Sequence, residues 1–381
     1  MRIVVCGGGV IGTAAAYELS RRGADVTLVE RWRIAGCASG KSGGFLARDW
    51  CDGSPVAELA HRSFDLHAIW AEQLGNPYGY RRVDTYSAVI GTRAGGSTPV
   101  PSIIANWLSP DAVHRRQLGD HATTAQLNPA AFTEALMRAA VANGAKLRIA
   151  TITGLAKSQT AKSQSQVTGV ELVGGEVISA DVVILAMGPW SMLASQWLPL
   201  PPIYGLKGHS LIFKPEAALP AEVIFAEVKG RNGDVHTPEV VSRADGTVYV
   251  CGLPGTGNLP VDPSRVLPED GGSEVLREVT FRLVPQLKSA PIIAGQVCFR
   301  PVTADGIPII GPIEGMDGVY VATGHSVWGM LNAPGTAEAL ACSILDGSPG
   351  SPSGPTDVDL AAFLPSRLAP LDPQSLEFIP S

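Results

Sequence analysis

The N-terminal thirty residues combine apolar runs with a glycine-rich turn, and this pattern predicts a strand, a helix and a second strand. A β-branched run at 3–6 precedes the glycines, an alanine-rich helix is expected from about 10 to 22, and the second strand ends at Glu30. Gly23 stands where a helix C-cap belongs. Apolar spacings of three or four, and short apolar runs, predict the later elements. Helices are expected at 55–74, 128–143, 274–287 and 334–345, and strands at 147–152, 167–173, 182–187, within 205–255, at 295–299 and at 319–323.

Size and composition indicate two lobes around one site. The chain has 381 residues, of which 45% are hydrophobic. This length exceeds the size at which a single hydrophobic core stops growing. Glycine (43) and proline (30) are both frequent, as is typical of many short strands joined by tight turns. We therefore expect an α/β protein rather than an all-helical one.

Charge and cysteine usage exclude several classes of partner. The net charge is −6 and no basic run occurs, so we expect no nucleic-acid partner. The cysteines form no CxxC pair, which favours a reducing intracellular compartment and no metal site. The predicted first strand begins at Arg2, which leaves no room for a signal peptide, and the apolar run at 182–187 is far too short for a membrane span. We expect a soluble, cytoplasmic protein, and import into an organelle stays open.

The glycines at the first turn form a dinucleotide-binding pattern. Gly7-x-Gly9-x-x-Gly12 directly follows a predicted strand and opens a predicted helix, which is the context that makes this pattern informative. Glu30 stands 18 residues after Gly12, where an acid binds ribose hydroxyls and disfavours a 2′-phosphate. Simple turn glycines would not explain the strand, helix and acid together. The pattern predicts a dinucleotide but does not choose between NAD and FAD.

Four segments carry a resemblance to a known family. They are "VVCGGGVIGTAAAYELSRRGADVTLVER" near the N-terminus, "ADVVILAMGPWS" at 180–191, "FRPVTADGIPIIGP" at 299–312 and "VYVATGHSVWGMLNAPGTAEALACSILDG" at 319–347. Together they resemble the D-amino-acid oxidase superfamily of flavoproteins, which includes glycine oxidase, sarcosine oxidase and D-amino-acid dehydrogenase. The loop "SGKSGGFLARDW" resembles a fungal and plant branch of poorly characterised oxidoreductases.

The resemblance implies an architecture and a cofactor. We expect a discontinuous, Rossmann-type FAD domain at 1–82, 126–202 and 296–346, and a mostly antiparallel substrate domain at 83–125 and 203–295. Residues 347–381 are expected to form a surface tail. FAD is the implied cofactor, with the flavin between the two domains.

The resemblance also implies which residues contact FAD. The loop from Ser39 to Gly44 is expected against the pyrophosphate or the flavin ring, and the turn from Gly324 to Gly329 is expected to present backbone N–H groups to the pyrimidine end of the flavin. For the side chains of His325 and Trp328, packing within a tight turn is the alternative to a cofactor contact, and both roles stay open. The full expected set is Gly7, Gly9, Val10, Ile11, Gly12, Glu30, Arg31, Ser39, Gly40, Ser42, Gly43, Gly44, Gly188, Trp190, Gly324, His325, Ser326, Val327, Trp328 and Gly329.

Arg300 is the candidate catalytic residue. It matches the family arginine that pairs with a substrate carboxylate, and two parallel N–H···O contacts would hold the substrate carbon near the flavin. A solvent-facing arginine is the alternative. Arg48 is a second candidate for contact with the substrate carboxylate, because it lies in the loop "SGKSGGFLARDW". Lys207 and His209 either reach the ring or simply lead into the sheet.

Cys298 raises the question of a covalent flavin. Sarcosine oxidases link flavin to a cysteine seven residues before an aspartate, and Cys298 has this spacing to Asp305. Arg300, however, matches glycine oxidase, in which a small residue usually stands at the cysteine position. A small buried strand cysteine is therefore the favoured alternative. Pro254 stands where sarcosine oxidases place an oxygen-activating lysine, so the electron acceptor, oxygen or another, stays open.

The predicted function is oxidation of an amine or amino acid by hydride transfer to flavin N5. The expected substrate is a small carboxylate-bearing amine. Two alternatives remain: a nicotinamide-dependent dehydrogenase, and a flavin-binding assembly or regulatory factor without turnover.

Overall fold

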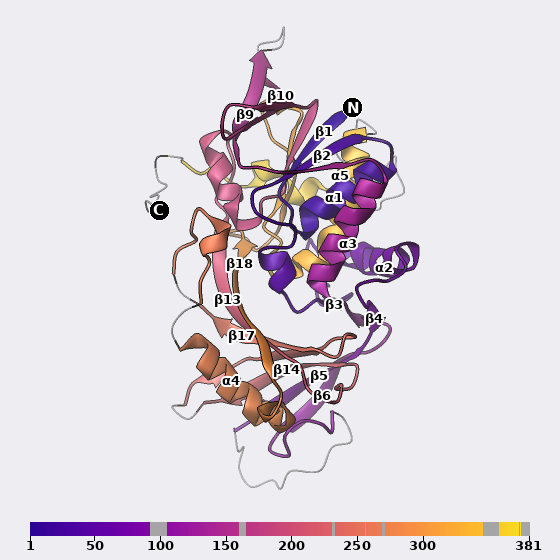
Figure 1. Ribbon diagram of the computed structural model, residues 1–381, viewed down its shortest axis with the longest axis vertical. Coiled ribbons are helices and arrows are strands. Elements are labelled where there is room, and N and C mark those ends of the chain that lie inside the picture. Colours follow the sequence, from indigo (N-terminus) through magenta and orange to yellow (C-terminus); the bar gives the residue numbers. More distant parts are fainter. Residues whose placement is uncertain are drawn as a thin grey trace.

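The protein has two lobes, and the long strands β13 and β18 run from the second lobe up beside the first (Figure 1). A computed structural model describes residues 1–91, 105–159, 165–230, 233–255, 257–268, 271–345, 358–372 and 374. The first lobe contains a six-stranded sheet, and the second contains an eight-stranded, mostly antiparallel sheet. The expected fold class, a Rossmann-type α/β lobe beside an antiparallel lobe, is confirmed.

The six-stranded sheet has the order β19-β21-β12-β1-β2-β8. From β21 to β8 all neighbours are parallel, whereas β19 is antiparallel to β21. Because parallel strands share a direction, their carboxyl ends open at one edge of the sheet. The strands are β1 (Arg2–Cys6), β2 (Asp25–Glu30), β8 (Lys146–Ile149), β12 (Val182–Leu185), β19 (Ile309–Pro312) and β21 (Val319–Thr323).

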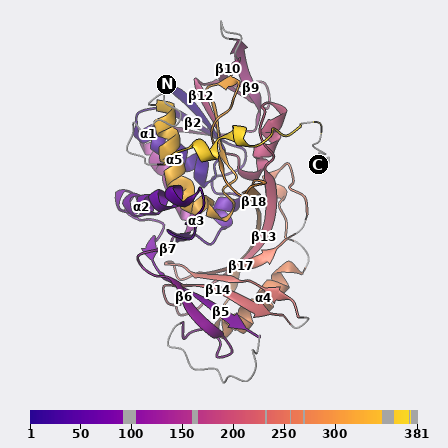
Figure 2. The same ribbon diagram turned by 180° about the vertical axis from the view of Figure 1, so that it is seen from behind.

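Helices pack together beside the first sheet, and Figure 2 shows α5 next to α1 and α2. The alanines at 14–16 of α1 are fully buried, so their small side chains allow α1 to approach its neighbours closely. The small strands β9, β10, β11 and β20 form a separate sheet. The helices are α1 (Val10–Arg21), α2 (Ala57–Gln73), α3 (Pro129–Ala142) and α5 (Gly329–Leu345), and the small strands are β9 (Ile152–Gln159), β10 (Ser165–Leu172), β11 (Val177–Ser179) and β20 (Met316–Asp317).

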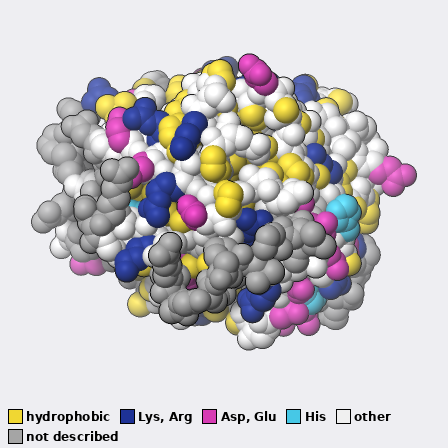
Figure 3. All heavy atoms as spheres, turned by 90° about the horizontal axis from the view of Figure 1, so that it is seen from below, with side chains coloured by type: hydrophobic (Ala, Val, Ile, Leu, Met, Phe, Trp, Pro, Cys, Tyr) yellow, Lys and Arg dark blue, Asp and Glu magenta, His cyan; other side chains and the backbone are white. Residues whose placement is uncertain are grey.

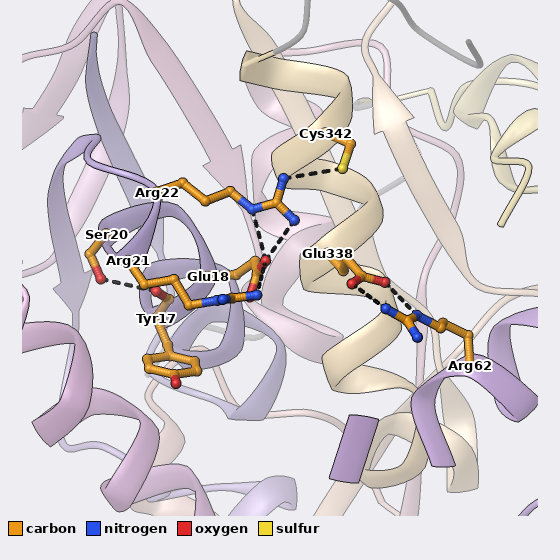
Figure 4. A network of polar contacts seen from close by, with 8 residues as sticks. All are labelled: Tyr17, Glu18, Ser20, Arg21, Arg22, Arg62, Glu338 and Cys342. Carbon is orange, nitrogen blue, oxygen red and sulfur yellow. Dashed lines mark hydrogen bonds and ion pairs between the residues drawn. The ribbon is translucent and has the colours of Figure 1, made fainter. Parts of the chain in front are cut away.

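Buried charges connect three of these helices (Figure 4). Glu18 of α1 is fully buried and accepts hydrogen bonds from Arg21 and Arg22. Arg22 also donates to the Cys342 sulfur of α5 at 3.2 Å. Arg62 of α2 donates two hydrogen bonds to Glu338 of α5 at 2.8 and 2.7 Å. Each buried carboxylate therefore has the guanidinium partner that its burial requires.

The eight-stranded sheet has the order β18-β13-β17-β16-β14-β5-β6, with β15 beside β14. Its neighbours are antiparallel except β14 and β5, and α4 packs on the face whose buried cluster includes Leu211 and Val250. A three-stranded sheet, β3-β7-β4, completes the described sheets. The elements are β3 (Phe45–Ala47), β4 (Arg81–Arg82), β5 (Asp84–Ile90), β6 (Val113–Gly119), β7 (Thr124–Gln126), β13 (Tyr204–Phe213), β14 (Glu222–Lys229), β15 (Val235–His236), β16 (Glu239–Ser242), β17 (Val248–Pro254), α4 (Gly272–Leu283) and β18 (Ile292–Val302).

Charged side chains of both signs are interspersed on the face seen from below, as far as Figure 3 colours its residues. No helix of the described chain is both long and apolar enough to cross a membrane. Within the same residues, no group of three or more His, Cys, Asp or Glu side chains is placed to hold a metal ion.

Two segments lie differently from the expected domain division. Residues 296–302 were expected with the first lobe, but they are the second half of β18, which pairs with β13 from Ile292 to Val302. The C-terminal residues 358–372 were expected on the surface, yet Val358, Leu360 and Phe363 are buried in the core of the first lobe. Burial of these three apolar side chains holds the segment against the first lobe, although the sequence around them is rich in proline and serine.

Helix α5 begins at Gly329, five residues before the predicted start at Pro334. Proline has no N–H, so it leaves the carbonyl four residues earlier, that of Met330, without its helical partner. His67 of α2 replaces that partner: its Nε2 contacts the carbonyl oxygens of Met330 and Leu331 at 3.0 and 3.1 Å. Gly335 N donates instead to Ser63 Oγ at 3.1 Å. Side chains of α2 therefore allow α5 to pass through its proline.

We expect His67 to make the protein acid-sensitive. His67 is fully buried, and burial lowers its pKa from 6.5 to about 4. Below pH 6.5 the unfolded chain binds a proton at this histidine and the folded protein does not, so the free energy of unfolding falls as the pH falls, by about 2 kcal/mol between pH 7 and pH 4.5. Urea unfolding of the apoprotein at pH 7 and pH 4.5 measures this loss. His67→Gln keeps an N–H donor but does not titrate, so its loss should be clearly smaller; an equal loss would assign the acid sensitivity to other groups.

Candidate active site

A cleft of about 540 Å³ opens at the carboxyl edge of the six-stranded sheet. Residues that follow β1, β2, β8, β12 and β21 form its walls. This is where a ligand is expected in an open α/β sheet. The wall residues from these strand ends are Gly7, Gly8, Gly9, Glu30, Arg31, Ala150, Thr151, Ile152, Thr153, Ala186, Met187, Gly188, Thr323, His325, Ser326, Val327 and Gly329.

Close backbone contacts require glycine at two positions of the turn after β1. Gly7 has φ +114°, and a Cβ there would lie 2.5 Å from the Ala186 carbonyl oxygen. A Cβ on Gly12 would lie 2.0 Å from the Gly7 carbonyl oxygen. A Cβ on Gly9 would meet only Ser39 Oγ, at 3.2 Å. Gly7 and Gly12 thus bring strand and helix together, and Gly9 leaves room beside the N-terminus of α1, where phosphate binds favourably.

Two side chains orient groups toward this turn. Glu30 accepts hydrogen bonds from Gly8 N at 2.6 Å and Trp32 N at 2.7 Å, one on each carboxylate oxygen. Each oxygen keeps a second lone pair for a ribose hydroxyl. Ser39 Oγ accepts from Val10 N at 2.8 Å, so its own hydrogen points elsewhere and is available to an anion. The fingerprint, the acid and the serine therefore form one structural unit.

A loop of the second lobe lies over the cleft. Arg31 donates to the Val261 carbonyl at 2.9 Å, and Trp190 Nε1 donates to the Pro260 carbonyl at 2.8 Å. Val261 and Pro263 line the cleft. No sequence pattern predicted this contact, because a proline-containing loop between β17 and α4 carries no motif that indicates what it packs against.

The turn before α5 is strained and directs the N-terminus of that helix into the cleft. Gly324 has φ +78° and Ser326 has φ +50°, a conformation that is costly for a serine. His325 is buried, its Nε2 lies 3.1 Å from Thr336 Oγ1, and burial lowers its pKa to about 3. A neutral imidazole and the positive end of α5 thus face the cleft.

Several expected contacts shape the cleft without lining it. Gly12, Gly40, Gly43, Gly44, Gly324 and Trp328 are not in its walls. Added Cβ atoms on Gly40 and Gly44 would meet the Ala35 and Leu127 carbonyl oxygens at 2.0 Å, and one on Gly43 would meet the Tyr249 ring at 3.2 Å. These glycines allow segments of the protein to approach each other closely, and their contacts with FAD stay predictions. Ser39 and Ser42, from the same loop, do line the cleft.

Arg300 is the one substrate candidate that lines the cleft. It is half-buried on β18, and its Nε has no hydrogen-bond partner among the described residues. Arg48 instead forms an ion pair with Asp65 at 3.7 Å, away from the cleft wall. His209 packs against Gly272 of α4, and Lys207 lies 5.8 Å from the Phe299 ring centroid. Leu206 of β13 is the register partner of Arg300, so the two side chains share one face of the sheet. Lys207 and His209 are one and three residues further along β13, so their side chains point to the opposite face.

Comparison with known proteins identifies this architecture. The family model described as DAO, FAD dependent oxidoreductase, matches residues 2–343. The chain belongs to the DAO family of FAD-dependent oxidoreductases. It is similar to a putative oxidoreductase of Schizosaccharomyces pombe, 29% identical over 91% of this chain and 94% of that protein. It is also 29% identical to a glycine oxidase of Pseudomonas aeruginosa, over 93% of this chain and 99% of that one.

Solved structures of the family share the fold. The crystal structure of glycine oxidase from Geobacillus kaustophilus superposes with a TM-score of 0.76 at 23% identity, covering 96% of this chain and 99% of that one. FAD is therefore the cofactor of this DAO-family protein, which confirms the resemblance, and the protein is an FAD-dependent oxidoreductase. The choice between NAD and FAD, which the glycine pattern left open, is settled.

The cleft fits FAD on its own chemistry. Its glycine cradle, the fixed acid Glu30 and the N-termini of α1 and α5 match a ribose, a pyrophosphate and an electron-accepting ring that gains negative charge. The residues that would hold the cofactor are the wall residues of the expected set. Their individual contacts with FAD stay predictions.

For Cys298 we expect no covalent link to the flavin. Cys298 is buried outside the cleft wall, and its thiol accepts a hydrogen bond from the Cys37 thiol, which lowers the pKa of Cys298. Acid precipitation of the holoenzyme should release the yellow colour to the supernatant. Cys298→Ser should release the same amount; colour that stays in the wild-type pellet and leaves the Cys298→Ser pellet would prove a thioether bond.

Proposed function

We propose that this FAD-dependent oxidoreductase oxidises the C–N bond of a carboxylate-bearing amine, that is, an amino acid or an N-alkyl amino acid. The observation that carries the proposal is Arg300, a half-buried guanidinium at the cleft wall with an unpaired Nε. Buried guanidinium groups with free donors are matched by carboxylates, which accept two parallel hydrogen bonds. The relatives named glycine oxidase are consistent with this substrate class.

The residues of the chain would act mainly by positioning. Arg300 binds the substrate carboxylate and so fixes the orientation of the neighbouring carbon toward the flavin. The cleft-wall residues of the expected set would hold FAD, which would supply the hydride acceptor for this oxidation. The positive end of α5 and the backbone of the 325–329 turn would stabilise negative charge at the cofactor ring. Burial keeps His325 neutral, so it adds no positive charge of its own there.

An anaerobic titration tests the proposal. We expect a small set of amino acids or N-methyl amino acids to bleach the visible flavin spectrum of the holoenzyme without oxygen, whereas the matching amines that lack a carboxylate bleach it far more slowly. Admitting air and then an artificial electron acceptor shows which of them restores the spectrum. Failure of the whole panel to bleach a flavin that dithionite does reduce would favour a flavin-binding assembly or regulatory factor.

A further inference from the structure

Glu239 lies on the same face of the eight-stranded sheet as Arg300. Side chains directly opposite each other in register project from one face of a sheet. Gln296 and Arg300 are four residues apart on β18, so they share that face. The register joins five residues across β14, β16, β17, β13 and β18: Phe225, Glu239, Cys251, Ser210 and Gln296.

A chain of hydrogen bonds holds the Glu239 carboxylate in place. The Cys251 thiol donates to Glu239 Oε2 at 3.5 Å. Tyr249 forms hydrogen bonds with Cys251 and with Ser210. Burial raises the pKa of Glu239, and the Cys251 hydrogen bond and the charge of Arg300 lower it. Glu239 is half-buried, and no described residue forms an ion pair with it.

A cluster of aromatic rings from both lobes includes Phe225, the residue directly opposite Glu239 in register. Phe225, the register partner of Glu239, has its ring centroid 4.8 Å from that of Trp50. Trp50 lies 6.3 Å from Trp328, in the turn that carries the cleft residues 325–327. Phe45 is 5.1 Å from both Phe225 and Trp50. All four rings are half-exposed. Aromatic faces beside a carboxylate attract cations, both through the ring quadrupole and through the charge.

We propose that Glu239, with Phe225 and Trp50, forms a subsite for a substituted ammonium group, and that the ligand is a zwitterion held between Glu239 and Arg300. This inference deepens the proposed function and rests on it, because Arg300 supplies the opposite subsite. The subsite also discriminates. A ligand with a carboxylate alone meets the repulsion of Glu239, and a ligand with an ammonium alone meets that of Arg300, so zwitterions bind best.

The test uses two ligands that cannot reduce flavin. Tetramethylammonium and acetate are titrated separately into the holoenzyme, and binding is followed by the perturbation of the visible flavin spectrum. Tryptophan fluorescence of the apoprotein, to which Trp50 and Trp328 contribute, gives a second readout. We expect Glu239→Gln to weaken tetramethylammonium binding at least tenfold and to leave acetate binding unchanged or tighter. Arg300→Met should do the reverse.

Glu227→Gln is the matched control. Glu227 is an exposed carboxylate two residues beyond Phe225 on β14, so it shares the sheet face without the aromatic rings. It should leave both affinities unchanged. Tetramethylammonium binding that is absent in the wild type, or equal in wild type and Glu239→Gln, overturns the inference. Acetate binding that ignores Arg300→Met, while the Glu239 effect holds, overturns the proposed function and leaves the cation subsite standing.

Discussion

Arg300→Met is expected to raise KM for carboxylate substrates steeply while FAD stays bound. Methionine keeps an apolar chain of similar length but removes all guanidinium donors. Loss of one member of a buried, hydrogen-bonded charge pair costs about 2–5 kcal/mol, which is roughly 30- to 4,000-fold in affinity. Steady-state kinetics with the amino acid that bleaches the wild-type flavin most readily measures the change. The flavin spectrum of the purified variant shows that the cofactor is retained.

Arg300→Lys provides the control for charge. Lysine keeps the positive charge but not the planar pair of donors, so we expect an intermediate KM. Amines without a carboxylate should react with Arg300→Met no more slowly than with the wild type, because they never used the guanidinium. Unchanged kinetics with carboxylate substrates would remove Arg300 from the site.

The first lobe could be predicted from the sequence because its signals are local. The strand, the glycine turn, α1 and the acid at the end of β2 lie within Arg2–Glu30, and β21 (Val319–Thr323) was predicted with its observed bounds. Ala150 to Thr153 were missed, although the same logic could have found them. They follow β8, and a parallel neighbour of β2 ends at the same edge as Glu30.

The second lobe could not be predicted in the same way, because its site depends on register between distant strands. His209 and Arg300 were both candidates, but a residue's face is decided by pairing across strands, and β13 pairs with β18 so that the two face oppositely. No sequence pattern indicated Glu239, because its proposed role depends on Phe225 and Cys251, which lie opposite it on the flanking strands. The start of α5 was misplaced because the partner that tolerates Pro334, His67, lies on another helix.

Gly12→Ala is expected to lose both stability and FAD. The new Cβ would stand 2.0 Å from the Gly7 carbonyl oxygen, and that oxygen belongs to a backbone turn that cannot rotate away. To relieve this contact, α1 must move away from β1, and we expect the free energy of unfolding to fall by about 2 kcal/mol or more, as is typical of overpacking. The same movement displaces Val10 N and the N-terminus of α1 from the cleft. Urea unfolding of the apoprotein and fluorescence titration with FAD measure the two losses.

Two other alanine substitutions separate these losses. Gly9→Ala places its Cβ only near Ser39 Oγ, a side-chain atom that can move, so we expect normal apoprotein stability with FAD affinity weakened about tenfold or more by the loss of close phosphate approach. Gly295→Ala, in β18, adds a Cβ in ordinary contact with Leu211 and Ser273 and should change neither quantity. If Gly12→Ala unfolds at the same urea concentration as the wild type, the prediction is wrong: α1 and β1 can then accommodate a Cβ at this position, and Gly12 is needed only for the cofactor.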